Sequence, residues 1–343
     1  MEEQHKRRVR YKGTHPRKFE EKYKELNPEK YADTVAKVIS KGSTPAGMHI
    51  SIMVKEILDI LKIQPGEQGV DATLGYGGHT RKMLDELNGR GHIYGLDVDP
   101  IEIVKTTERL RNAGYGEDIF TPVSENFANV AKIAERYGCF DFCLADLGVS
   151  SMQIDNPERG FSYKLDGPLD LRLNPQAGIS AADRLLELSQ DEIEGMLVEN
   201  SDEPYAAEIV KKIRKDKRIS TTTELRETIE KALEFLPNSR EKKDILKKTC
   251  QRVFQALRID VNSEFEVLES FLNSLPDIMN PGGRIAILTF HSGEDRLVKK
   301  AFKAYKQLGL FSDIATDVIR PGAEECRNNG RARSTKLRWA VKA

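Results

Sequence analysis

The sequence has no long hydrophobic run. Residues 285–290, IAILTF, are typical of its apolar segments and fall far short of the ~20 residues that a transmembrane helix needs. The polar, basic N-terminus leads into no apolar segment of the kind found in a secretory signal. We therefore expect a protein that neither spans a membrane nor is secreted, and that works in the cytoplasm.

Cysteine is scarce as well, with four residues in a chain of 343. Cys139 and Cys143 lie in an apolar segment, the other two lie far from them, and no CxxC or HxxxH spacing is present. Four scattered thiols neither form a disulfide scaffold for a chain of this length nor offer the ligand spacing of a zinc site. We expect reduced cysteines and no bound metal.

Net charge is absent too, because 54 Lys and Arg balance 54 Asp and Glu, and this excludes charge-driven disorder of the whole chain. The charges are nevertheless segregated. Residues 1–18 hold seven basic and two acidic side chains, residues 211–260 fifteen and eight, and residues 320–343 seven and two. This segregation favours a polyanionic partner, although solvated helix faces would produce a similar pattern.

Short apolar runs alternate with helical patterns in the first half of the chain and return near its end. We predict strands over residues 69–74, 92–97, 118–123, 140–146, 283–290 and 336–341. Strands that alternate with helices form βαβ units, so the fold class is α/β with a doubly wound, mostly parallel sheet.

The alternation stops after residue 154. Residues 155–175 have no apolar periodicity, and a helical stretch follows to about residue 262, where capping boxes at Ser189 and Thr221 begin two helices. The chain is therefore expected to contain a basic N-terminal arm (1–43), the first part of an α/β core (44–154), a substrate loop with a helical insertion (155–262), and the second part of the core (263–343).

A ligand site is predicted where the first strand leads into the glycine-rich turn of residues 75–78. Glycines let a ligand approach the backbone closely, and Asp97 ends the second strand 22 residues after Gly75, which suits a carboxylate that binds ribose hydroxyls. The dinucleotide fingerprint fails because Thr80 occupies its third glycine position, and no G-K-[ST] of a P-loop follows. An S-adenosylmethionine site and a simple surface turn both remain open.

Two further side chains belong to the same predicted crevice. Asp146 ends the fourth strand, and the carboxyl ends of parallel strands meet at one edge of a sheet. Asp146 could equally cap a helix, and His79, which follows the glycines, could equally be a turn residue.

Several stretches taken together resemble the bacterial small-subunit ribosomal RNA cytosine-N4 methyltransferases, the MraW family. Their order is that of the family, and they extend from about residue 44 to the end of the chain. The stretches are residues 71–79 (DATLGYGGH), 146–155 (DLGVSSMQID), 159–163 (RGFSY), 166–172 (DGPLDLR), 255–259 (QALRI), 261–264 (VNSE), 290–292 (FHS), 294–296 (EDR) and 331–338 (RARSTKLR).

The resemblance implies a class I, Rossmann-like methyltransferase that uses S-adenosyl-L-methionine. It implies that the enzyme methylates the exocyclic amine of a cytosine in the decoding region, with the small ribosomal subunit or its RNA as partner. Carried over by motif, the cofactor contacts are Gly77, Gly78, His79, Asp97, Phe127, Asp146 and Gln153.

A cytosine amine is a weak nucleophile because its lone pair is delocalised into the ring, so an acceptor for its N–H groups is expected. Many DNA amino-methyltransferases supply one from an [DN]-P-P-[YF] motif, but this chain contains no Pro-Pro. Asp146 occupies the corresponding place and is the first catalytic candidate; His291 and Ser292, after the fifth strand, are the second. Phe161 and Tyr163 could stack on a flipped-out base or could simply anchor their loop.

The chain departs from the family pattern at three places. Ser51 stands where the family usually has proline, Gly293 replaces a usual leucine, and the basic arm is additional, so we expect a divergent branch or a second copy. A non-catalytic RNA-binding assembly factor that keeps the methyltransferase fold is the alternative function, because a fold does not determine an activity. A protein-methylating enzyme is a third possibility, which the basic segments disfavour.

Overall fold

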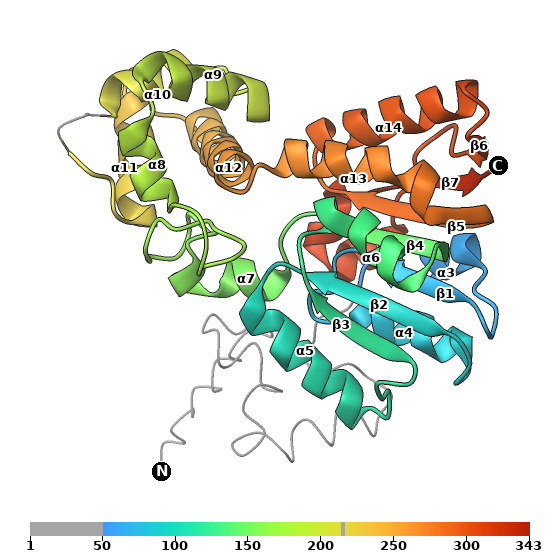
Figure 1. Ribbon diagram of the computed structural model, residues 1–343. Helices are drawn as coiled ribbons and strands as arrows, with labels where there is room; N and C mark the ends of the chain where they lie inside the picture. The colour runs from blue at the N-terminus through green and yellow to red at the C-terminus, as the bar shows by residue number, and fades with distance from the viewer. Residues whose placement is uncertain (1–50, 214–216) are drawn as a thin grey trace, which may run out of the picture. The chain divides into compact units, whose positions relative to one another are not determined.

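A computed structural model describes residues 51–213 and 217–343 of the chain (Figure 1). Ser51–Ala343 form one compact unit around a seven-stranded sheet of order β3-β2-β1-β4-β5-β7-β6. The strands are β1 (Gln68–Asp71), β2 (His92–Asp97), β3 (Phe120–Ser124), β4 (Phe140–Asp146), β5 (Met279–Thr289), β6 (Phe311–Ile314) and β7 (Lys336–Lys342).

The sheet is parallel except at β7, which pairs antiparallel with both β5 and β6. The strand order runs outward from β1 in two directions, through β2 to β3 on one side and through β4 to β5 on the other. This is a doubly wound arrangement with its switch point between β1 and β4, so the predicted fold class is confirmed.

Alternating side chains of the strands build a hydrophobic cluster on each face of the sheet, as the period of two requires. On β4, Cys143 and Ala145 belong to one cluster, while Phe142 and Leu144 belong to the other. The first cluster is covered by α6 (Val130–Tyr137), α13 (Glu264–Ile278) and α14 (Ser292–Gln307), and the second by α3 (Val54–Leu61), α4 (Gly78–Leu87) and α5 (Pro100–Asn112). The helices therefore form a layer on each side of the sheet.

The predicted bounds of the first and fifth strands need correction, and one strand was not predicted. The first strand ends at Asp71 rather than at residue 74, because the Asp71 carboxylate accepts the N–H of Thr73 (3.1 Å) and turns the chain out of the ladder. The fifth strand begins earlier, at Met279, with a register irregularity opposite β4. The sequence pattern missed β6, a four-residue strand with two exposed side chains.

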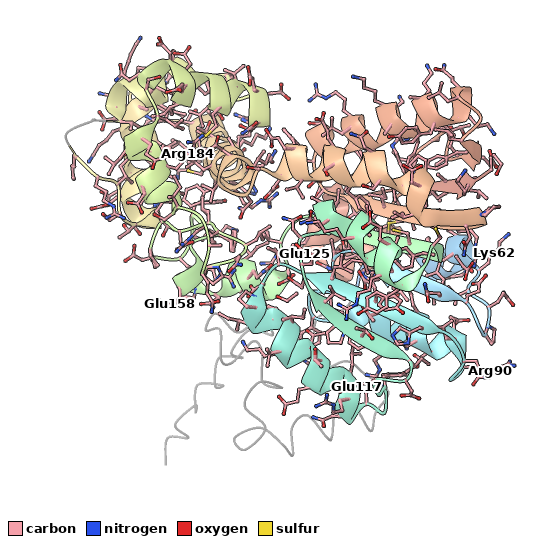
Figure 2. The ribbon with its side chains drawn as sticks, in the orientation of Figure 1. Lys62, Arg90, Glu117, Glu125, Glu158 and Arg184 are labelled. Carbon is pink, nitrogen blue, oxygen red and sulfur yellow. The ribbon has the colours of Figure 1, made fainter. Side chains whose placement is uncertain are left out.

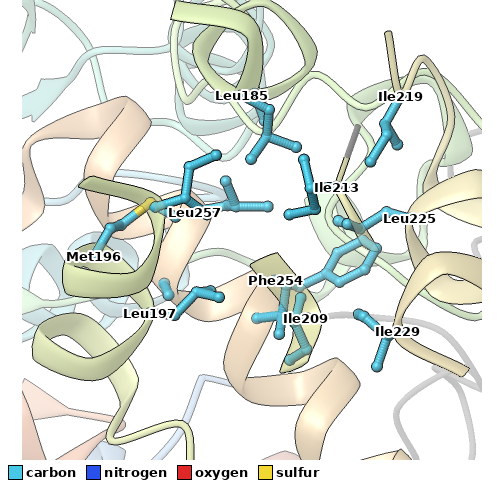
Figure 3. Packing of buried hydrophobic residues seen from close by; sticks show 14 of the residues in the cluster. Leu185, Met196, Leu197, Ile209, Ile213, Ile219, Leu225, Ile229, Phe254 and Leu257 are labelled. Atoms are coloured by element: carbon cyan, nitrogen blue, oxygen red, sulfur yellow. The ribbon is translucent and has the colours of Figure 1, made fainter. Parts of the chain in front are cut away.

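Helices occupy most of the chain between β4 and β5. They are α7 (Ser151–Asp155), η3 (Pro157–Arg159), α8 (Ala181–Glu187), α9 (Gln190–Ser201), α10 (Ala206–Lys212), α11 (Thr222–Ala232) and α12 (Arg240–Asn262), followed by α13, which packs on the sheet. Both predicted capping boxes are confirmed, at Ser189 with Glu192 and at Thr221 with Glu224. Aliphatic and aromatic side chains from α8 to α12 form a separate hydrophobic cluster, shown in Figure 3.

The predicted basic arm, residues 1–43, lies outside the described residues. Within residues 51–213 and 217–343, no helix is both long and apolar enough to cross a membrane. The boundaries proposed for the helical insertion, 155 and 262, stay predictions, although they bracket α8 to α12.

Replacing Leu257 by alanine should destabilise the helical part of the protein. Leu257 lies on α12, is fully buried in the cluster of Figure 3, and would leave a cavity that costs about 2–5 kcal/mol of unfolding free energy. Leu308→Ala is the matched control, because that side chain is 71% exposed, and its effect should stay within about 0.5 kcal/mol. Equilibrium urea unfolding measures both; equal losses would contradict the assigned core.

Candidate functional site

Three carboxylates end neighbouring parallel strands. Asp71, Asp97 and Asp146 are the last residues of β1, β2 and β4. Because these strands are parallel and adjacent, the three side chains reach the same edge of the sheet, at its switch point. Ligands of open α/β sheets bind at this place.

A glycine turn joins β1 to α4 at this edge. Gly75 and Gly77 have φ of 47° and 79°, a conformation that favours glycine. A Cβ on Gly78 would lie 2.1 Å from Ser51 Oγ, and one on Gly77 would lie 2.6 Å from Thr106 Cγ2. The helix that follows, α4, has no side-chain cap at Gly77, so its first N–H groups stay available to an anionic group of a ligand.

Both carboxylate oxygens of Asp97 accept backbone N–H groups, one of them from the glycine turn. Oδ2 accepts the N–H of Gly75 (2.7 Å), and Oδ1 accepts the N–H of Asp99 (2.8 Å). Burial raises the pKa of Asp97 to about 6, although these two bonds oppose the shift. Each oxygen keeps a lone pair for a ligand hydroxyl, and such donors would favour the ionised form.

Asp146 and His79 form a buried pair. His79 Nε2 lies 2.9 Å from the carbonyl oxygen of Ile52. A carbonyl can only accept, so Nε2 carries a hydrogen, and the other ring nitrogen, Nδ1, lies 3.4 Å from Asp146 Oδ2. A favourable contact between these two atoms requires a proton on one of them.

The other carboxylate oxygen of Asp146, Oδ1, accepts no hydrogen bond from the described residues. Oδ1 is buried and has no hydrogen-bond partner among the described residues. Burial raises the pKa of Asp146 to about 6, and the nearby His79 works against that shift. A buried carboxylate oxygen without a donor is suited to bind an N–H group of a substrate or ligand.

Sequence reasoning missed Asp71. Its carboxylate accepts the hydroxyl of Thr80 on α4 (2.6 Å) and the N–H of Thr73 (3.1 Å), so it fixes the turn that carries the glycines. Burial raises its pKa. The available signal was an acidic residue inside the apolar run, residues 69–74, that predicted the first strand.

Gln153 and Phe127 lie at the edges of this site. Gln153 completes a capping box with Ser150 at the start of α7, and its Nε2 donates to Asp99 Oδ2 (3.3 Å). Phe127 begins the turn after β3 and packs edge-on against Phe271, with ring centroids 5.3 Å apart. Their proposed contacts with a cofactor stay predictions.

His291 caps α14 rather than standing free. Its Nδ1 accepts the N–H of Glu294 (3.4 Å), while its Nε2 lies 3.1 Å from Glu294 Oε1 but is not aligned for a hydrogen bond. Ser292 follows as an exposed first residue of α14. A catalytic role for either residue stays a prediction, and the capping geometry gives His291 a structural role of its own.

Glu264, His291 and Glu294 bring possible metal ligands within 4.8 Å of one another. The guanidinium of Arg258, however, donates to both oxygens of Glu264, at 2.7 and 2.9 Å. A cationic side chain therefore already compensates one of the two carboxylates. We interpret the group as an ion-pair network that joins α12, α13 and α14.

Phe161 and Tyr163 belong to the hydrophobic cluster of the helical segment. Phe161 is 9% exposed, and Tyr163 packs edge-on against Phe254 at 6.1 Å between centroids. Base stacking by either ring stays a prediction, and it would require the ring to expose a face that now contacts the core.

Comparison with known proteins decides the family. A family model described as the MraW methylase family matches residues 46–343. The chain belongs to the MraW methylase family. The resemblance found in the sequence motifs is thereby confirmed.

Relatives fall into two groups by identity. The chain is 67% identical to ribosomal RNA small subunit methyltransferase H 1 of Agathobacter rectalis, over 100% of this chain and 99% of the relative. It is 62% identical to methyltransferase H 2 of Alkaliphilus metalliredigens, over 100% of this chain and 99% of the relative. For methyltransferase H of Dictyoglomus thermophilum the identity is 38%, over 85% of this chain and 95% of the relative.

The residues covered by the family model and by the alignment with a relative differ at the N-terminal arm. The MraW model begins at residue 46, yet the alignment with the Agathobacter rectalis protein covers the whole chain. The first 45 residues are therefore outside the family model but shared with a similar relative. This supports the expectation of a divergent branch within the MraW family.

The methyl donor implied by the family, S-adenosyl-L-methionine, fits this edge of the sheet. Asp97 would accept from the ribose hydroxyls, and the uncapped start of α4 would face the carboxylate of the methionine part. The open Oδ1 of Asp146 would lie toward the reacting groups. The residues present therefore match the chemistry of this cofactor.

Asp97→Asn should weaken S-adenosyl-L-methionine binding by about tenfold to hundredfold near pH 8. The substitution removes charge-assisted hydrogen bonds worth about 1.5–3 kcal/mol. Calorimetry measures the affinity. An unchanged dissociation constant in a folded variant would contradict the assignment.

The affinity for S-adenosyl-L-methionine should also depend on pH. The raised pKa of about 6 keeps the Asp97 carboxyl protonated below that pH, and ligand hydroxyls require the ionised form. Affinity should therefore rise with pH, and binding at pH 5 should be about tenfold weaker than at pH 7. The rise should be smaller in Asp97→Asn, which has no proton to release at this position.

Proposed function

We propose that this protein transfers a methyl group from S-adenosyl-L-methionine to the exocyclic N4 amine of a cytosine in small-subunit ribosomal RNA. The observation that carries the proposal is the buried Asp146 Oδ1, which has no hydrogen-bond donor among the described residues and lies at the same sheet edge as the glycine turn and Asp97. Membership of the MraW family and the names of its relatives support the RNA substrate. A ribosomal substrate places this activity in the cytoplasm.

Asp146 is suited to activate the amine. Its Oδ1 would accept one N–H of the cytosine N4, which orients the amine and draws its lone pair out of conjugation with the ring. Because Oδ1 is buried, water competes little for this bond, and positioning supplies much of the rate. S-adenosyl-L-methionine, when bound, supplies an electrophilic methyl group on a cationic sulfur.

The pair of Asp146 and His79 can also take the released proton. When the N–CH₃ bond forms and the S–CH₃ bond breaks, the amine carries an extra proton and a positive charge. Asp146 Oδ1 receives this proton, and His79 Nδ1 lies 3.4 Å from the other carboxylate oxygen, Oδ2. His79 Nε2 stays on the Ile52 carbonyl throughout, which fixes the ring orientation.

Asp146→Asn should lower turnover much more than RNA binding. Asparagine keeps the size of the side chain but can no longer take the proton, so we expect the single-turnover methylation rate to fall by about 10²–10⁴-fold. The wild-type rate should rise with pH through about 6, as the Asp146 carboxyl ionises. Rapid-quench assays at saturating cofactor measure the rate; a wild-type rate in the variant would make Asp146 structural.

The substrate itself is tested most directly by nucleoside analysis. Small ribosomal subunits from cells without this gene are treated with the protein and S-adenosyl-L-methionine. Their nucleosides are then separated and identified by mass spectrometry. N4-methylcytidine is the expected product. A protein that binds the cofactor yet methylates no nucleoside would instead support the assembly-factor alternative.

A phosphate-binding surface is proposed on the helical segment. Lys243, Lys247 and Lys248 are exposed on α12, and Lys211 and Lys212 are exposed at the end of α10. Lysines that contact phosphates release counterions, so binding of the small subunit should weaken steeply as salt increases.

Changing Lys243 and Lys247 to glutamine should reduce the salt slope of binding by about one contact per lysine. The methylated nucleotide should stay the same, because phosphate contacts position a protein without reading bases. Lys62→Gln on the α/β core is the matched control, since this exposed lysine lies beside α3 (Figure 2). Filter binding at several salt concentrations gives the slopes, and equal slopes for all three proteins would refute this surface.

A further inference from the structure

Asp99 divides its two oxygens between two parts of the molecule. It is fully buried at the N-terminus of α5, where Oδ1 accepts the N–H groups of Ile101 (3.0 Å) and Glu102 (3.4 Å). Oδ2 is turned the other way and accepts from Arg159 Nη1 at 2.6 Å and from Gln153 Nε2 at 3.3 Å. One buried carboxylate therefore caps a core helix and binds the segment that follows α7.

Arg159 uses its remaining donors within its own segment. Nη2 donates to the carbonyl oxygens of Arg172 (3.1 Å) and Leu173 (2.8 Å), and the carbonyl of Arg159 accepts the N–H of Leu171 (3.2 Å). These bonds close residues 159–173 into a loop whose two ends meet at Arg159. Only 11% of the Arg159 side chain is exposed, so its guanidinium forms an internal ion pair and does not contact phosphates.

A single hydrogen bond connects the Asp99–Arg159 ion pair to the proposed cofactor site. The N–H of Asp99 donates to Asp97 Oδ1 (2.8 Å), the carboxylate assigned to the ribose hydroxyls. The backbone of Asp99 therefore connects Asp97 directly to the Arg159 ion pair. At the far end lies the loop that contains Phe161 and Tyr163, the residues proposed to meet the RNA.

We propose that Arg159 is a positioning residue that couples cofactor binding to RNA binding. Its ion pair with Asp99 holds the 159–173 loop in the arrangement that receives RNA, and a bound cofactor stabilises this arrangement by ordering Asp97 and Asp99. The proposal rests on the proposed function, since it takes the RNA as the second ligand. By linkage, each ligand must tighten the other by the same factor.

The test measures binding without methyl transfer. Small ribosomal subunits are titrated with the protein in the presence and absence of saturating S-adenosylhomocysteine, which lacks the transferable methyl group. In the wild-type protein this probe should tighten subunit binding on the order of tenfold, within the usual range of coupling between sites. In Arg159→Gln the factor should fall to about one, and the reciprocal titration of the probe in the presence of subunits should agree.

A double-mutant cycle isolates the ion pair. Asp99→Asn removes the charge but keeps a good helix cap at α5, so it should abolish the coupling by itself. Adding Arg159→Gln to it should then change nothing further. Arg159→Lys, which keeps the charge but cannot span Asp99 and both carbonyls, should retain part of the coupling and serves if the glutamine variant does not fold.

Arg184→Gln is the matched control. Arg184 forms an ion pair of the same 2.6 Å length with Asp260, within the helical segment (Figure 2). It should keep the full coupling factor. Coupling that persists in Arg159→Gln, is equally lost in Arg184→Gln, or is absent from the wild type would overturn the proposal. Absence of methylated nucleosides with coupling intact would refute the proposed reaction instead.

Discussion

The structure depends on burying carboxylates where three parallel strands end. Taking a carboxylate out of water is costly, and backbone N–H groups offset part of that cost. Asp71 and Asp97 receive such bonds from the turns beside them, whereas Asp146 has an oxygen with no donor among the described residues. The two carboxylates that accept backbone N–H groups fix the glycine turn. The Asp146 oxygen without a donor is the one proposed to bind the substrate amine.

Arginines join the helical segment to the α/β core. Arg159 binds Asp99, Arg258 binds Glu264, and Arg331 binds Asp155 at 2.8 Å. Planar guanidinium groups suit such ion pairs, because they present several donors in a fixed geometry. The same kind of contact can hold the two parts in register and transmit a change from one to the other.

Membership of the MraW family and the local geometry support each other. The family accounts for the order of the motifs, and the structure gives a physical role to each residue that it places. His79 is an example: the motif offers it as a cofactor contact, while the structure places its ring between the Ile52 carbonyl and Asp146. His291 shows the opposite outcome, since capping of α14 explains much of its surroundings.

The sequence by itself determined the features that depend on neighbouring residues. Hydrophobic period predicted β2 and β4 to the residue, and local hydrogen bonding predicted the capping boxes at Ser189 and Thr221. Strand-end position identified Asp97 and Asp146. Only the tertiary structure decided which distant atoms meet. Asp99 with Arg159, and His79 with Asp146, are joined by the strand order and by helix packing, which no local pattern encodes. The burial of Phe161 and Tyr163 was decided in the same way, because an aromatic residue in a loop can face either a core or a ligand.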